Sequence, residues 1–171
     1  MSRSAPVVVA PVGRRTFVAG LLLLVASPAF AMARRPPRVL FICRFATAKS
    51  ATARELLRKL AKQRGLALDV RSRGITPADH MPPQIRQRLI AEFGVDPASE
   101  PPHKLTQRDL DRADMVVLFD QLPPALHKTA TLDWTEQPSL IEQFDPSMAW
   151  LQQHCEALLE QLAKSARSQA S

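Results

Sequence analysis

The residues best suited to chemistry lie in one short stretch, where a cysteine is followed closely by a cation and a hydroxyl. Cys43 ends a continuous apolar run, which predicts a strand buried on both faces, and Lys49 and Ser50 stand where helical periodicity begins. A thiol in this place faces the positive end of a helix dipole and a row of backbone N–H groups, which stabilise a thiolate and attract an oxyanion. The stretch therefore predicts a phosphate-binding loop with Cys43 as its nucleophile. The predicted phosphate-binding residues are Arg44, Phe45, Ala46, Thr47, Ala48 and Lys49.

The elements that must position this loop are strands alternating with helices. Apolar runs predict strands at 39–43, 66–70, 115–119 and 131–134, and helical spacing predicts helices at 50–64, 82–93, 106–112 and 146–166. Such alternation predicts a parallel sheet covered on both faces. In such sheets ligands bind beyond the carboxyl ends of the strands, which is where Cys43 is expected to lie.

The first 33 residues differ from the rest of the 171-residue chain. They contain Arg3, Arg14 and Arg15, no acidic residue, and an uncharged apolar run of about 15 residues, shorter than the about 20 that a spanning helix needs. Small residues at Ala31 and Ala33 offer two cleavage points. The paired arginines ahead of the run predict a removable twin-arginine export signal and a periplasmic protein. The alternative is a start at Met32, which leaves the protein cytoplasmic.

The remaining chain is expected to form a short linker, 34–37, and one domain, 38–168. Without the leader's three arginines the formal charge falls from +7 to about +4, and no long basic run remains, so nucleic-acid binding and stable membrane insertion are not expected. Two cysteines and no Cys/His cluster at zinc spacing exclude a disulfide framework and a zinc-stapled fold. No cofactor or metal is predicted, and the protein is expected to be a monomer.

The stretch 39–50 resembles the phosphate-binding loop of the low-molecular-weight protein tyrosine phosphatases and of the related thioredoxin-coupled arsenate reductases. Residues 71–75 stand where this family has a serine-alanine-glycine-threonine turn, and Leu105-Thr106 and 113–117 match its later helix and strand. The resemblance implies an α/β fold: a four-stranded parallel sheet in a flavodoxin-like three-layer sandwich.

The resemblance also implies roles. Cys43 matches the nucleophile that forms a cysteinyl-phosphate, and Ser50 matches the hydroxyl that hydrogen-bonds the thiolate. Lys49 stands in place of an arginine, so a point charge replaces a guanidinium fork. Phe45 and Ala46 replace a glycine-asparagine pair, which costs free energy if the loop needs a positive φ there.

The general acid of the family is an aspartate followed by proline, and Asp145 has that pattern here. The same residues also read as an N-cap with proline at the first helical position. Asp133 and Glu136 are further carboxylates near this region, and Asp120 follows a predicted strand directly, where it would border the loop.

Three functions remain open from the sequence. The first is hydrolysis of a phosphate monoester or phosphoprotein through a cysteinyl-phosphate. The second is a non-catalytic module of the same fold that binds phosphate. The third, arsenate reduction, needs additional cysteines to close a disulfide, but Ala48 occupies the reductases' cysteine position and the other cysteine, Cys155, is expected in the core of the last helix.

Overall fold

The described residues of this computed structural model are 35–79, 81–128 and 131–168. The strands are β1 (Arg38–Cys43), β2 (Asp69–Gly74), β3 (Met115–Leu118) and β4 (Thr131–Asp133). They form one sheet in the order β2-β1-β3-β4, and every neighbouring pair is parallel. This confirms the predicted four-stranded parallel sheet. The predicted export signal, 1–33, lies outside the described residues, and within them no helix is long and apolar enough to cross a membrane.

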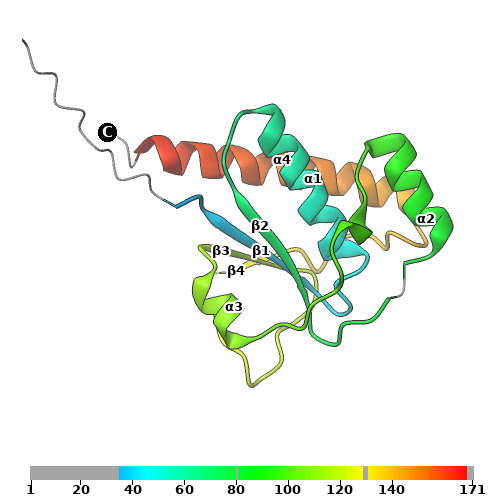
Figure 1. Ribbon diagram of the computed structural model, residues 1–171, viewed down its shortest axis with the longest axis horizontal. Coiled ribbons are helices and arrows are strands. Elements are labelled where there is room, and N and C mark those ends of the chain that lie inside the picture. Colours follow the sequence, from blue (N-terminus) through cyan, green and yellow to red (C-terminus); the bar gives the residue numbers. More distant parts are fainter. Residues whose placement is uncertain (1–34, 80, 129–130, 169–171) are drawn as a thin grey trace, which may run out of the picture. The chain divides into compact units, whose positions relative to one another are not determined.

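The helices cover both faces of the sheet (Figure 1). The long helices α1 (Lys49–Gln63) and α4 (Phe144–Ser168) lie on one face, and α3 (Gln107–Arg112) lies on the other. Between β2 and α3 the chain also forms α2 (Pro83–Arg88), a π turn (Leu89–Phe93) and a 3-10 turn (Pro97–Ser99).

The central strand β1 divides the core in two. Its residues alternate between faces, so that Phe41 and Cys43 join the cluster under α1 and α4, whereas Leu40 and Ile42 join the smaller cluster under α3. This is why the sequence of β1 is apolar without interruption: the strand is buried on both sides.

The second strand lies later than the sequence predicts, at 69–74 rather than 66–70. It is an edge strand, and its side chains alternate between the buried Val70 and Ser72 and the more exposed Arg71 and Arg73. A half-exposed edge strand has no continuous apolar run, so its own sequence does not mark it clearly. The prediction therefore falls on the apolar residues at 66–70, most of which precede the strand.

Two helix starts differ slightly from the predicted ones. Thr106 is the N-cap of α3, in a capping box in which Asp109 accepts a hydrogen bond from the Thr106 backbone N–H. The last helix begins at Phe144, ahead of the predicted start at 146, so Asp145 lies within its first turn instead of at its N-cap. A carboxylate there still interacts favourably with the helix dipole.

Candidate active site

The thiol of Cys43 lies at the carboxyl end of β1, where the chain turns into α1. The residue is 5% exposed, and its Sγ lies 3.0 Å from the Ser50 Oγ. The backbone N–H of Ala46 donates to the same sulfur at 3.2 Å. A thiolate at this position would thus accept two hydrogen bonds, one from the loop and one from the first turn of the helix.

The loop turns its carbonyl groups away from the sulfur. The carbonyl oxygens of Cys43, Arg44 and Phe45 accept hydrogen bonds from the segment after β2, at 3.1, 2.8 and 3.2 Å. In a trans peptide the N–H of the next residue points the opposite way. Accordingly, the Ala46 N–H donates to the Cys43 sulfur, and the Arg44 N–H donates to Asp120, which lines the same cavity. Donors arranged in this way form a cradle for an anion.

Ala46 has a positive φ of 63°, the one such residue other than glycine in the described chain. A side chain in this left-handed region costs about 1 kcal/mol or more. The loop is held there by close packing: a Cβ built on Gly74, at the end of β2, would lie 2.9 Å from the Phe45 carbonyl carbon. Gly74 therefore allows β2 to approach the loop, and the strain expected from the sequence at Ala46 is present.

A cavity of about 240 Å³ opens over the thiol. Lys49 lines it and forms no ion pair with any residue that the structure describes, so its charge is available to a ligand. The rim is apolar: Leu140 is buried and Ile141 is 52% exposed. The full lining consists of Cys43, Arg44, Phe45, Thr47, Ala48, Lys49, Asp120, Ser139, Leu140 and Ile141.

Among the described carboxylates, Asp120 alone lines this cavity. It follows β3 directly, and its Oδ2 accepts a hydrogen bond of 2.9 Å from the Arg44 backbone N–H. Because β1 and β3 are parallel neighbours, their carboxyl ends meet at the same edge of the sheet, which brings Asp120 to the loop.

The other predicted carboxylates lie elsewhere. Asp145 is absent from the described residues that line the cavity, and it pairs with Arg88 at 2.8 Å with its side chain 78% exposed. Asp133 accepts hydrogen bonds from Thr135, which hold the pKa of Asp133 below its usual value. Glu136 is exposed and also absent from the described lining. The structure therefore brings the predicted loop residues together but does not bring Asp145 to them.

The rim residues Leu140 and Ile141 were not identified from the sequence. They lie in the segment between β4 and α4, which has no regular apolar spacing to predict its path. Their position depends on how this segment packs against the end of the sheet.

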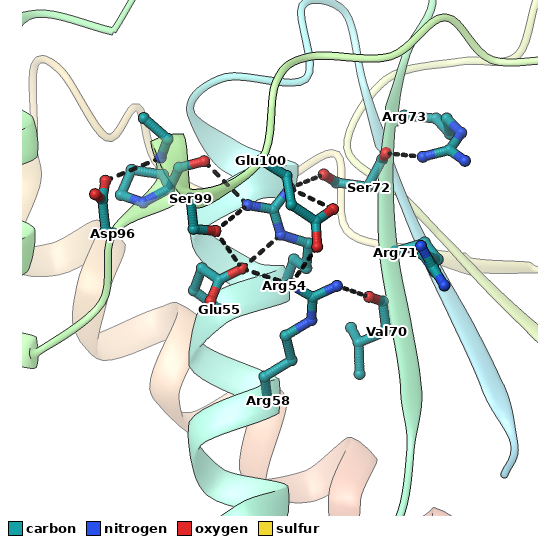
Figure 2. A network of polar contacts seen from close by, with 12 residues as sticks. Arg54, Glu55, Arg58, Val70, Arg71, Ser72, Arg73, Asp96, Ser99 and Glu100 are labelled. Atoms are coloured by element: carbon teal, nitrogen blue, oxygen red, sulfur yellow. Dashed lines mark hydrogen bonds and ion pairs between the residues drawn. The ribbon is translucent and has the colours of Figure 1, made fainter.

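Behind the loop, a buried arginine joins α1 to β2 (Figure 2). Arg54 is 1% exposed, one turn after Ser50, and its guanidinium donates to the Ser72 Oγ at 2.7 Å and to the Ser99 Oγ at 2.9 Å. Glu55 and Glu100 lie 2.7 and 3.6 Å from it. These contacts hold α1 against β2, the strand whose Gly74 packs against the loop after Cys43.

The fold and the site define a class of α/β proteins in which a cysteine thiol ends the first strand of a parallel sheet and a short loop leads from it into a helix. The model of the low molecular weight phosphotyrosine protein phosphatase family matches residues 38–168. The chain belongs to that family.

Solved structures of the same fold include phosphatases and an arsenate reductase. The low molecular weight protein tyrosine phosphatase of T. tengcongensis is 21% identical, with a TM-score of 0.64, over 73% of this chain and 99% of that one. The thioredoxin-dependent arsenate reductase of Corynebacterium glutamicum is 25% identical, with a TM-score of 0.59, over 78% of this chain and 65% of that one. The chain thus spans slightly less than two thirds of that reductase.

A third relative is a low molecular weight phosphotyrosine phosphatase of Vibrio cholerae, 20% identical with a TM-score of 0.63, over 75% of this chain and 98% of that one. No curated protein sequence matches the chain. At these identities the phosphatase structures establish the shared fold.

Proposed function

We propose that the protein hydrolyses a phosphate monoester, with Cys43 as the nucleophile. The observation that carries this proposal is the pair of contacts on its sulfur, 3.0 Å to Ser50 and 3.2 Å to the Ala46 N–H, at the base of a cavity that also holds Lys49. These groups can bind a phosphate and stabilise the thiolate that attacks it.

The reaction has two steps. The Cys43 thiolate attacks phosphorus, an S–P bond forms, and the P–O bond to the leaving alcohol breaks. Water then attacks the cysteinyl-phosphate, inorganic phosphate forms, and the thiolate leaves with a hydrogen bond from Ser50. Lys49 and the loop N–H groups balance the charge on the transferring phosphoryl group in both steps.

The leaving oxygen needs a proton in the first step, and the attacking water must lose one in the second. We assign this acid–base role to Asp120, because its carboxyl group lines the cavity, whereas Asp145 is paired with Arg88. The apolar rim formed by Phe45, Leu140 and Ile141 suits an aromatic or apolar ester group.

Arsenate reduction is disfavoured by the second cysteine. Both cysteines of the sequence lie in the described part of the chain, and Cys155 is 0% exposed on α4 within the core. Burial raises the pKa of the Cys155 thiol well above its usual value, so it stays protonated and is a poor nucleophile for an arsenylated Cys43.

Hydrolysis of two aryl phosphates by the full-length protein tests the proposal. We expect turnover of p-nitrophenyl phosphate that is lost in Cys43→Ser. Asp120→Asn retains an oxygen that can accept the Arg44 N–H, so the loop stays in place while the proton is removed. We expect kcat/KM of this variant to fall about 100-fold or more on phenyl phosphate, and much less on p-nitrophenyl phosphate, whose leaving group needs no proton. Because kcat/KM covers only the steps up to departure of the alcohol, hydrolysis of the shared cysteinyl-phosphate, in which Asp120 also acts, does not enter the comparison.

Asp145→Asn is the matched control and should behave like the wild type with both substrates. Equal loss of kcat/KM on the two substrates in Asp120→Asn, or a leaving-group effect in Asp145→Asn, would contradict the role given to Asp120. Phosphate binding without turnover above Cys43→Ser would identify the chain as a phosphate-binding module.

The export signal over residues 1–33 remains part of this proposal, on the sequence evidence of Arg14-Arg15 and the short apolar run. N-terminal sequencing of the protein from separate periplasmic and cytoplasmic fractions of its native cells tests it. A periplasmic protein that begins at residue 32 or 34 supports cleavage after Ala31 or Ala33, and a protein confined to the cytoplasm, uncleaved or begun at Met32, refutes export.

A further inference from the structure

A second cavity, of about 260 Å³, lies on the opposite face of the sheet from α1, beside α3. It shares no lining residue with the cavity over Cys43. Five of its lining residues are arginines: Arg38, Arg71, Arg73, Arg108 and Arg112. The proposed hydrolysis uses none of them.

The parallel register explains how the strand arginines converge. Arg71 stands opposite Leu40, and Arg73 opposite Ile42, and both of these β1 residues lie in the core cluster under α3. Directly opposed residues of paired strands share a face, so the two arginines lie on the α3 side of the edge strand. Figure 2 shows Arg73 extending from β2 on the side away from Arg54.

Two carboxylates balance part of this charge. Asp69 accepts from Arg38 at 2.7 Å and from Arg71 at 2.6 Å, and Asp109 accepts from Arg73 at 3.0 Å. Burial alone would raise the pKa of Asp109, but hydrogen bonds from Thr106 and the charge of Arg73 hold it below its usual value. Both carboxylates are therefore ionised at neutral pH. Their two negative charges only partly balance the five positive charges of the arginines.

Arg108 and Arg112 carry the excess charge. They lie four residues apart on α3, so their side chains are neighbours on one face, where like charges repel. Within the described part of the chain, neither forms an ion pair or a side-chain hydrogen bond. Both residues line the same cavity as Arg73 and Arg71.

We propose that this cavity binds a small ligand carrying an oligophosphate group. Guanidinium forks match phosphate oxygens in pairs, and several of them around one hollow favour a chain of phosphates over a single anion. The cavity is slightly smaller than the roughly 300 Å³ at which pockets for drug-sized ligands begin, which suits a compact anion. The site is independent of the reaction proposed for Cys43.

Calorimetric titration of the full-length protein with tripolyphosphate tests this proposal. All variants carry Lys49→Ala, which removes the loop cation and so weakens binding over Cys43 equally in every variant. We expect saturable binding that weakens at higher salt. Adding Arg108→Gln and Arg112→Gln should weaken it about tenfold or more, because two charge-assisted contacts are lost while the fold keeps its hydrogen bonds.

The matched control adds Lys62→Gln and Arg64→Gln instead. These exposed residues at the end of α1 line neither cavity, and their replacement removes the same charge. We expect the control to bind tripolyphosphate within about twofold of its parent. No binding in the Lys49→Ala parent, equal weakening in the two double variants, or binding of phosphatidylglycerol vesicles but not of tripolyphosphate would each overturn the proposal.

Discussion

At the scale of single residues, the proposed hydrolysis depends on Lys49 as the cation beside Cys43. It lines the cavity over Cys43 and forms no ion pair with the described residues. An ammonium group acts as a point charge, whereas a guanidinium group at the same place can bond two equatorial oxygens at once. Hydrolysis by this chain is therefore expected to be slower than hydrolysis by the same protein with arginine at position 49.

Lys49→Arg should raise kcat/KM for p-nitrophenyl phosphate about tenfold, since it adds one charge-assisted hydrogen bond to the transition state. Steady-state kinetics of the purified protein measure this. Lys49→Gln is the control and should fall below the wild type, because it lacks the charge. The same rate in both variants would show that the cation does not contribute to the reaction.

At the scale of elements, the buried Arg54 joins three segments that meet behind the loop. It extends from α1 to Ser72 on β2 and to the Pro97 carbonyl and Ser99 in the 3-10 turn. Removing one partner from a buried charge network leaves the others without compensation, which costs more than losing an exposed ion pair.

Arg54→Met should therefore lower the free energy of unfolding by about 3 kcal/mol. Arg58 shares Glu55 and Glu100 but its side chain is 31% exposed, so Arg58→Met should cost about 1 kcal/mol. Urea denaturation followed by circular dichroism compares the two. Similar losses in both variants would mean that burial of the Arg54 charge does not govern the stability of this region.

At the scale of the whole molecule, carboxylates paired with arginines make the fold sensitive to acid. Burial opposes ionisation of Asp69 and Glu100, but their arginine partners prevail and the pKa of each carboxyl group is lowered. A lowered pKa in the folded state gives stability that is complete above the unfolded-state pKa, about 3.9 for Asp and 4.3 for Glu, and is lost as the pH falls further.

The free energy of unfolding should thus change little through these groups between about pH 7 and 5, and should decrease below about pH 4. Urea denaturation at several pH values measures the slope. Glu100→Gln should reduce that slope, because this side chain no longer binds a proton on unfolding. A variant that keeps the full wild-type slope would show that Glu100 does not contribute to it.

The local chemistry of the loop and the class of fold follow from the sequence alone. The uninterrupted apolar run of β1 requires a strand buried on both faces, and the cation and hydroxyl after Cys43 mark the start of a helix. Both patterns involve residues close together in the sequence. Patterns of this kind suffice to predict the parallel sheet, the loop after Cys43 and the burial of Cys155.

The tertiary structure decided which distant residues meet. The sequence offers Asp145 as the general acid and predicts only that Asp120 borders the loop. The parallel pairing of β1 and β3 brings Asp120 to the cavity, whereas Asp145, in the first turn of α4, pairs with Arg88. The edge strand β2 was predicted too early because only one of its faces is buried. The second cavity, lined by five arginines, also depends on the tertiary structure. Strand register and the position of α3 bring together arginines that are far apart in the sequence.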